Sequence, residues 1–427
     1  MEMISLDLPR SILHYMQDYM EHFPFSGTIS VVQKGEILFN QAYGMACIEL
    51  DVPNHTDTRY SLASVSKQFT AFAVMQLYDN ALIDLDQPVN NYLPAELKLD
   101  PRITAHHLMS HTSGLPTFHG LDEHFFGDKD KMNYNQREFS SLFRDRPLHF
   151  EPGAQYEYCN AGYHMLAFLI EAVSSLSFKD YLEENIFKPL GMSDTIVEDG
   201  MEILKNKAFG YCMNKDRIVR GEYHNLAYSI GAGGIVSTCS DLYKWYLCLK
   251  DRKLLGRRTY TRFFKENLNG YCYGLFKDTH YGKSRFYHDG AYLGIGAYVQ
   301  NFFEDDICMI VLCNYDFVND FRIGNAISDL IFKGTALIPK KPLEVVIDPE
   351  LANKYEGIYI KDRVELRKVN KCWEFVQLGR FHKPIYPIGN HQFHSTWLDH
   401  SYTLYECEDG EFTFLGQRKQ KDALNKH

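Results

Sequence analysis

The spacing of apolar and polar residues changes its period several times along the chain. Two stretches of strand-like character, Gly27–Gln33 and Ile37–Tyr43, flank the turn Lys34–Gly35–Glu36 and predict a β-hairpin. Residues 285–314 alternate short apolar runs with glycine and acidic turn residues, which predicts two or three antiparallel strands. Apolar residues at helical spacing predict helices in SVSKQFTAFAVMQLYD and near 104–111, 135–145, 160–175, 178–186, 239–250 and 318–333.

Strand-like segments on both sides of a helical middle favour an α+β fold whose terminal hairpins meet in one antiparallel sheet. After Gly334 the stretch ALIPKKPLEVVIDPEL holds three prolines, which predicts a linker with a short strand over Glu344–Ile347. The remaining residues form short strand-like segments with polar turns and predict a small antiparallel barrel or half-barrel. We therefore expect two domains, residues 1–335 and 336–427. The strand-like segments are YEGIYI, VELRKV, CWEFVQL, QFHSTW, YTLYEC and FTFLGQ.

The composition narrows the class of protein. With 427 residues, 45% of them hydrophobic and 23% charged, the chain can bury a large core and resembles ordinary soluble globular proteins. It has 55 acidic and 45 basic residues, for a net charge of −10. A mildly acidic chain without a basic block is a poor ligand for a phosphate backbone. We therefore expect no nucleic-acid partner.

The first residues of the chain and the distribution of its cysteines indicate where in the cell the protein is expected. MEMISLDLPRSILHYMQDYMEHF has no basic segment followed by an unbroken apolar run, so it predicts an amphipathic helix with Pro9 in its first turn. No apolar run is long enough to span a bilayer. The ten cysteines are spread singly, without a CxxC pair, as expected of reduced and buried thiols. These features predict a cytoplasmic protein without a membrane partner; an exported form that has lost its leader is the alternative.

The first motif that could carry chemistry is Ser64-Val65-Ser66-Lys67, at the start of a long predicted helix. Ser64 and Lys67 are three residues apart and share one helix face. A serine at a helix N-terminus is a usable nucleophile when a neutral amine beside it accepts its proton. Alone, S-x-x-K is a weak signal, because a helix cap beside a solvated lysine is the simpler explanation of it. The helix after Lys67 is apolar on almost every side, which favours a packed site.

The second motif, Tyr158-Cys159-Asn160, lies between a Glu-Pro-Gly turn and an apolar helix. Residues i and i+2 of an extended segment face the same way, so the phenol and the carboxamide would project together. That pair suits a proton relay and a contact to an amide. A core tyrosine followed by an asparagine helix cap is the simpler explanation of the motif by itself.

The third motif, His288-Asp289-Gly290-Ala291, lies within a predicted strand. His288 and Gly290 share a face, and a glycine there lets another backbone approach closely. An extended substrate could pair with this strand edge and leave a backbone N–H for an oxyanion. The alternative is a histidine on a solvated strand face beside a bulge glycine.

The order of these motifs resembles a known family. Ser64, Tyr158 and His288 are separated by 94 and 130 residues, and each lies beside a turn or an element end. The chain is similar, over roughly residues 20–335, to the serine β-lactamases of class C, the penicillin-binding proteins and the related esterases and D-aminopeptidases. The resemblance rests on SLASVSKQFTA, ITAHHLMSHTSGLP, PGAQYEYCNAGYHMLA, GAGGIVSTCSDLYKW and HDGAYLGIGAY.

The resemblance implies a β-lactamase/transpeptidase-like domain, with an antiparallel sheet flanked by helices and a helical subdomain, and a lipocalin-like barrel in members with a second domain. It implies that Ser64 is acylated, with Lys67 and Tyr158 sharing general-base and general-acid duty. Asn160 would hold the acyl-side amide of the substrate and orient Lys67. The oxyanion hole would be the backbone N–H groups of Ser64 and Ala291. No metal or organic cofactor is implied.

The third motif departs from the Lys-Thr-Gly of typical β-lactamases, whose cation and hydroxyl meet a substrate carboxylate. His288 and Gly290 would take part in substrate binding here, as in the His-x-Gly of related DD-peptidases, D-aminopeptidases and esterases. Asp289 would repel an anion where threonine would donate a hydrogen bond. We therefore expect weak or no β-lactamase activity.

A histidine cluster offers a competing interpretation. His107 and His111 are four residues apart on a predicted short helix, the spacing of two zinc ligands, with His106 and His119 nearby. HExxH would require a glutamate between the two histidines, and none is there. The stretch also coincides with the His-Thr-Ser-Gly signature of the family, so we predict no metal site.

The sequence thus predicts a serine hydrolase that acts through Ser64 on small esters, amides or D-amino-acid-containing peptides. Its partner would be a small-molecule or short-peptide substrate, and a homo-oligomer is compatible with the sequence. The alternatives are a non-catalytic or slowly deacylating penicillin-binding or sensor protein, and a metal-dependent hydrolase. Specificity is expected in the loops Gly120–Gln136 and Lys205–Tyr228 and in the C-terminal domain.

Overall fold

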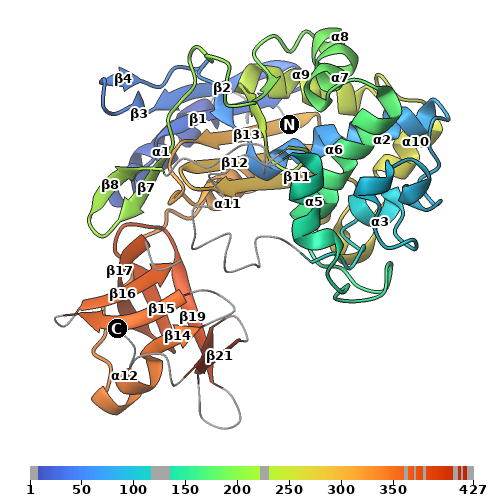
Figure 1. The fold of residues 1–427 in the computed structure, drawn as a ribbon. Coiled ribbons are helices and arrows are strands. Elements are labelled where there is room, and N and C mark those ends of the chain that lie inside the picture. Colours follow the sequence, from blue (N-terminus) through green and yellow to red (C-terminus); the bar gives the residue numbers. More distant parts are fainter. Residues whose placement is uncertain are drawn as a thin grey trace. The chain divides into compact units, whose positions relative to one another are not determined.

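The computed structural model describes residues 8–116, 135–221, 230–359, 364–369, 372–377, 381–406, 412–414 and 417–420 (Figure 1). The chain divides into two compact units. Unit 1 comprises Met1–Phe25, Gly210–Gly221 and Tyr315–His427, and unit 2 comprises Ser26–Phe209 and Glu222–Asn314. This division into units does not test whether residues 1–335 and 336–427 fold as separate domains, so the predicted domain boundary stays a prediction.

A six-stranded antiparallel sheet forms the centre of unit 2, with the strand order β10-β11-β12-β13-β1-β2. Along its length β1 pairs with β13, so Gly27 lies opposite Cys313 and Gln33 opposite Ile307. Strands from the two ends of the unit therefore meet in one sheet, which confirms the α+β prediction. The strands are β1 (Gly27–Gln33), β2 (Glu36–Tyr43), β10 (Phe276–His280), β11 (Lys283–Tyr292), β12 (Ile295–Phe302) and β13 (Ile307–Cys313).

The helices of unit 2 enclose the helix that follows Ser64. This helix, α2 (Lys67–Asp79), is buried at every position from Lys67 to Leu77 and packs against α6 (Asn160–Ser174) and α10 (Arg257–Phe263). Figure 1 shows α2, α3, α5, α6 and α10 gathered near β11, as expected of a helical subdomain. The other helices are α3 (Ala105–Met109), α5 (Gln136–Arg144), α7 (Phe178–Leu182), a π-helical turn over Glu183–Phe187, α8 (Lys188–Leu190) and α9 (Cys239–Lys250).

Short elements complete unit 2. A three-stranded sheet in the order β5-β9-β6 lies beside the turn that precedes α2, and β3 pairs with β4. The bounds are β3 (Met45–Cys47), β4 (Val52–Pro53), β5 (Tyr60–Ser61), β6 (Ile196–Val197) and β9 (Ile235–Ser237), with 3-10 turns at Ala63–Ser66, Val89–Asn91, Ala95–Leu97 and Leu268–Gly270.

None of the described helices is by itself both long and apolar enough to cross a bilayer. Taken together, α6 and the helical segment Phe178–Leu190 reach the required length and composition, but the two are bent by 80° at their junction. Most of α6 is buried in the core of unit 2, which accounts for its apolar composition.

Unit 1 contains two helices that pack against each other, α1 (Leu8–His22) and α11 (Asp320–Lys333). As predicted, α1 has Pro9 in its first turn and buries one apolar stripe, from Leu8 to Tyr19. The unit also contains the hairpin β7 (Tyr211–Asn214) and β8 (Arg217–Arg220), and α12 (Pro349–Tyr355), which precedes the last group of strands.

The last group of strands in unit 1 forms a closed antiparallel barrel, because its first strand pairs with both the second and the last. Aromatic residues fill its core, among them Tyr355, Trp373, Phe375 and Phe393. The predicted barrel is therefore confirmed. Its strands are β14 (Gly357–Tyr359), β15 (Val364–Val369), β16 (Cys372–Gln377), β17 (Phe381–Gly389), β18 (Gln392–Ser395), β19 (Ser401–Glu406), β20 (Phe412–Phe414) and β21 (Gln417–Gln420).

Two details of unit 1 differ from the sequence prediction. The strand expected over Glu344–Ile347 is wrong, since residues 335–348 form neither helix nor strand. Val345 donates a single backbone hydrogen bond of 2.9 Å to the Pro387 carbonyl, which is too little for a ladder. By contrast β17 was not predicted, because Pro384 and Pro387 interrupt its strand pattern.

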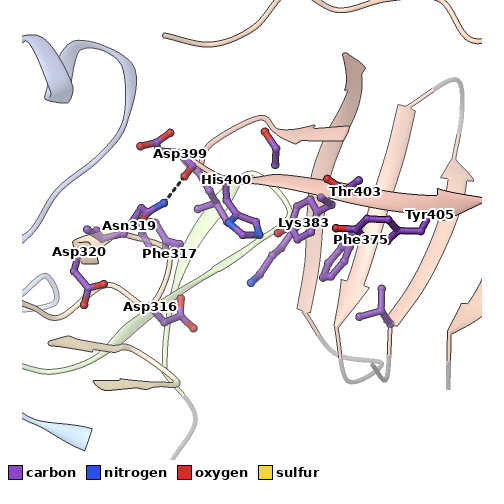
Figure 2. Close-up of a pocket in the computed structure, with 15 residues that line it drawn as sticks. Asp316, Phe317, Asn319, Asp320, Phe375, Lys383, Asp399, His400, Thr403 and Tyr405 are labelled. Atoms are coloured by element: carbon purple, nitrogen blue, oxygen red, sulfur yellow. Dashed lines mark hydrogen bonds between the residues drawn. The ribbon is translucent and has the colours of Figure 1, made fainter. Parts of the chain in front are cut away.

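A cavity of about 650 Å³ in unit 1 lies beside the barrel (Figure 2). Its lining combines aromatic rings with charged groups. Lys383 and Phe375 come from barrel strands, while Asp316 comes from the segment that precedes α11. Burial lowers the pKa of Lys383, and the nearby charge of Asp316 opposes that change.

Candidate active site

Ser64 lies in the 3-10 turn Ala63–Ser66, directly before α2. Ala63 has a φ of 43°, a left-handed conformation that alanine rarely adopts, so the backbone is strained where it turns toward Ser64. Strand β9 holds this turn at two points: Leu62 N–H donates to the Ile235 carbonyl, and Ile235 N–H donates to Ser66 Oγ. Ser64 itself is only half-buried, whereas Val65 and Ser66 are buried.

The Lys67 side chain lies next to Ser64, as the S-x-x-K spacing predicts. Its Nζ atom is 2.9 Å from Ser64 Oγ and donates a 2.8 Å hydrogen bond to the Ala232 carbonyl. Lys67 is fully buried, and burial lowers the pKa of its amine well below the usual range, while the charge of Asp289 acts in the opposite direction. An uncharged amine that donates to Ala232 has a lone pair available for the Ser64 proton.

The Ala232 carbonyl was not expected from the sequence, although it lies in the GAGGIVS segment. The preceding Gly231 has a φ of 74°, and a Cβ there would lie 2.3 Å from the Tyr163 carbonyl oxygen. Only glycine fits this position. The Gly231 carbonyl accepts a 2.7 Å hydrogen bond from Thr70 Oγ1 on α2, which places the segment against Lys67.

Tyr158 lies on the same side of the site as Lys67. The Lys67 Nζ atom is 4.9 Å from the centre of the Tyr158 ring. The phenolic oxygen is buried, and burial raises the pKa of Tyr158 well above its usual range, with Ser64 as the main opposing influence. Tyr158 is therefore a neutral phenol at neutral pH and has a proton to donate.

His111 positions the Tyr158 segment. Its ring centre is 4.3 Å from that of Tyr158, and its Nδ1 accepts a 3.1 Å hydrogen bond from the Cys159 backbone N–H. Cys159 is extended, as predicted, and Asn160 is the first residue of α6. The sequence analysis considered His111 as a metal ligand and as part of the His-Thr-Ser-Gly signature, but it did not predict the contact with the Tyr158 segment.

The histidine cluster does not form the predicted helical pair. α3 ends at Met109, and His111 lies beyond it with a φ of 58°. His107 accepts the Thr104 backbone N–H in a capping box, and His106 Nδ1 lies 2.6 Å from the Tyr273 hydroxyl. His119 lies outside the described residues. Within the part of the chain that the structure describes, no three His, Cys, Asp or Glu side chains are grouped to hold a metal ion.

Strand β11 carries the third motif and lies against the Ser64 turn. His288 and Gly290 are buried while Asp289 and Ala291 are exposed, which confirms the predicted alternation. A Cβ on Gly290 would lie 2.1 Å from the Leu62 carbonyl oxygen and 3.1 Å from the Ser64 nitrogen. The close backbone approach that the glycine predicted is thus present.

The part of β11 next to Ser64 has one open edge among the described strands. β10 begins at Phe276, which lies opposite Tyr287. Among the described strands, the segment from His288 to Tyr292 therefore pairs with β12 alone. An extended substrate could form hydrogen bonds to this edge. The oxyanion hole assigned to Ser64 and Ala291 remains a prediction.

His288 does not carry a positive charge at neutral pH. It is 1% exposed, and burial lowers its pKa to about 4. Its Nδ1 lies 2.6 Å from the Asp289 carbonyl, which can only accept, so Nδ1 carries the proton. Nε2 then accepts from the Tyr271 hydroxyl at 3.2 Å.

A half-buried serine in a strained turn, next to a buried lysine amine and a buried phenolic oxygen, is the arrangement expected of a serine hydrolase site of the S-x-x-K type. The family described as Beta-lactamase matches residues 14–331, and the chain belongs to this family. The family resemblance and the fold class predicted from the sequence are therefore confirmed.

Three comparisons illustrate the relationship. Penicillin-binding protein 4* of Bacillus subtilis (strain 168) is 26% identical over 436 residues, covering 95% of this chain and 96% of its own. D-aminopeptidase of Brucella anthropi is 28% identical over 319 residues, covering 70% of this chain but 59% of the relative. The octameric penicillin-binding protein homologue from Pyrococcus abyssi has a similar fold, with a TM-score of 0.68, 24% identity and 94% coverage of each chain.

Proposed function

We propose that this protein is a serine hydrolase that forms an acyl-enzyme on Ser64 and hydrolyses small esters, amides or D-amino-acid-containing peptides. The observation that carries the proposal is the 2.9 Å distance between Ser64 Oγ and the buried Lys67 amine. Relatives named D-aminopeptidase support a hydrolase. None of the described carboxylates contacts the Lys67 amine, so no ion pair with them holds it in its charged form.

In the proposed acylation, the neutral Lys67 amine takes the proton from Ser64 as Oγ bonds to the substrate carbonyl carbon. The backbone N–H groups of Ser64 and Ala291 stabilise the oxyanion. Tyr158, a neutral phenol, protonates the leaving group as its bond to the carbonyl carbon breaks. The Lys67 ammonium then returns its proton to the Tyr158 phenolate.

In the proposed deacylation, a water molecule attacks the acyl carbon and gives its proton to Lys67. The ester bond to Ser64 breaks, and Oγ regains a proton from the Lys67 ammonium. These roles make Lys67 the base and Tyr158 the acid, a choice that the sequence left open. The opposite pKa changes of the two groups support it.

The substrate-binding roles of Asn160, His288 and Gly290 remain proposals. The uncharged His288 and the acidic Asp289 offer little to a substrate carboxylate, which supports weak or no β-lactamase activity. The octameric Pyrococcus neighbour supports a homo-oligomer here as well. The cytoplasmic location stays a prediction.

The alternative function is a penicillin-binding or sensor protein whose acyl-enzyme persists. Two relatives from Bacillus subtilis are named as penicillin-binding proteins, which supports this alternative. Intact-protein mass spectrometry separates the two, because a hydrolase returns to its original mass while a sensor stays acylated on Ser64.

The direct test is Ser64→Ala, assayed with a p-nitrophenyl ester, a D-alanyl p-nitroanilide and a fluorescent penicillin. We expect turnover of at least one substrate by the unmodified protein and a loss of about 10³-fold or more in the variant. The exposed Ser141 on α5 provides a control, since Ser141→Ala removes a hydroxyl that donates to the Glu138 carbonyl of the same helix. Equal turnover in Ser64→Ala would refute the mechanism.

A further inference from the structure

We propose that Asp289 makes the cleft select acyl donors with a positively charged group next to the scissile bond and reject donors with a carboxylate there. This inference rests on the proposed function, because it names the class of substrate that Ser64 would attack. Asp289 would be a specificity-determining residue and the counter-ion of a substrate ammonium group.

The first step concerns where Asp289 lies. Its neighbour Gly290 touches the backbone of the Ser64 turn, with a Cβ position 3.1 Å from the Ser64 nitrogen. Asp289 and Ala291 share the exposed face of β11, along the segment that β10 leaves open. The Asp289 charge also acts on Lys67 and Tyr158, so it is close enough to affect a substrate that lies along this edge with its carbonyl at Ser64.

The second step concerns the other charges near Ser64. Lys67, His111 and His288 are the described basic groups that surround it, and all three are buried. Burial lowers the pKa of each, which keeps the two histidines neutral at pH 7 and favours the uncharged form of Lys67. Asp289 is the carboxylate whose charge acts on Lys67, on His288 and on Tyr158 alike. The described part of the cleft is therefore electronegative.

The third step concerns whether another cation neutralises Asp289. Its carboxylate forms no ion pair or side-chain hydrogen bond with the described residues. The two cations on the same strand are already engaged: Arg285 pairs with Asp278, with Nε 2.9 Å from Oδ1, and Lys283 pairs with Asp305. Among the residues that the structure describes, therefore, no cation pairs with Asp289.

The expected size of the selectivity between charged and uncharged substrates follows from Coulomb's law. A pair of unit charges about 5 Å apart at the edge of a protein surface interacts strongly enough to change a rate constant about tenfold. Salt screens such a pair, so the selectivity should fall as ionic strength rises. A carboxylate at the same place would be disfavoured by a similar factor.

The test compares pairs of substrates in which one member carries a positive charge and the other does not. On the acyl side the pair is D-alanyl p-nitroanilide, with a free ammonium, and its N-acetyl derivative. On the leaving-group side the pair is the choline ester of N-acetyl-D-alanine and the 3,3-dimethylbutyl ester, which has the same shape without the charge. The rate of Ser64 acylation is followed by intact-protein mass, alongside kcat/KM.

We expect the charged member of at least one pair to react about tenfold faster, and the pair that responds shows which side of the bond faces Asp289. In Asp289→Asn the ratio should fall to about one, and 0.5 M NaCl should reduce it in the unmodified protein. Glu304→Gln is the matched control, because it removes one exposed carboxylate from the turn after β12 and should leave the ratio unchanged.

Equal rates within both pairs, or a ratio that persists in Asp289→Asn, would overturn the inference while leaving the hydrolase intact. Failure of the proposed function looks different. In that case no substrate acylates Ser64, or Ser64→Ala turns substrates over as fast as the unmodified protein. Either result would remove both proposals.

Discussion

At the scale of single residues, burial rather than residue type decides the chemistry of this site. A lysine and two histidines surround Ser64, and burial lowers the pKa of all three, which favours their uncharged forms. The same enclosure keeps Tyr158 protonated. The site therefore presents a ready base and a ready acid side by side, which acid–base catalysis requires.

The pH dependence of catalysis should report the state of Lys67. With an uncharged substrate such as N-acetyl-D-alanyl p-nitroanilide, kcat/KM should fall on the acid side as Lys67 becomes protonated. Asp289 raises the pKa of Lys67, so its removal lowers that pKa further. We expect the acid limb of the profile to move to lower pH in Asp289→Asn and to stay in place in Glu304→Gln. A limb that moves to higher pH would contradict Lys67 as the base.

At the scale of elements, the contact between β11 and the Ser64 turn assembles the site. Gly290 makes that contact possible, because any larger side chain would meet the Leu62 carbonyl. The sequence indicated the glycine but not the backbone that it faces, since Leu62 and Gly290 are 228 residues apart in the chain.

Gly290→Ala should push β11 away from Ser64. We expect a loss of about 10²-fold or more in kcat/KM, since misplacement by about 1 Å has effects of that size. Overpacking should also lower the free energy of unfolding by about 1–3 kcal/mol. Urea titration and steady-state kinetics measure the two effects.

Gly282→Ala is the control for this prediction. Gly282 lies in the β10–β11 turn with a φ of 71°, and nothing lies within 4 Å of its Cβ position. The variant should cost about 1–2 kcal/mol of backbone strain and retain its activity. Gly290→Ala with activity within twofold of the unmodified protein would show that β11 does not position the site.

At the scale of the whole molecule, histidines that folding keeps neutral connect stability to pH. Burial holds the pKa of His288 and of His106 at about 4, whereas an unfolded histidine titrates near ~6.5. Between these values the unfolded chain binds protons that the folded chain does not. The free energy of unfolding therefore decreases as the pH drops from about 6.5 toward 4.

The midpoint of urea unfolding, followed by circular dichroism, should decrease from pH 7 to pH 5. Each such histidine can add up to about 1.4 kcal/mol per pH unit to the slope. His106→Gln should make the dependence shallower, because it removes one of these groups outside the Ser64 site. A midpoint that is flat or rises toward pH 5 would contradict the neutral state of these side chains.

Local sequence patterns were sufficient for the elements whose signal is short-range. Periodicity and turn residues, which act over a few positions, predicted three elements. These are the hairpin that begins with Gly27–Gln33, the helix after Ser64 and the barrel. Prediction failed where a contact overrides the pattern. In β17, Pro384 and Pro387 are accommodated within a paired strand, and at His111 the chain leaves the helix to reach Cys159.

By itself, then, the sequence determined the α+β architecture and the family, and it predicted roles for Ser64, Lys67 and Tyr158, because residue type and spacing encode the motifs. The tertiary structure alone decided which groups are charged. Burial, the Ala232 carbonyl beside Lys67, and the approach of Gly290 to Leu62 depend on residues distant in the chain. Protonation states follow from that enclosure, and they make Asp289 the charge that a substrate meets.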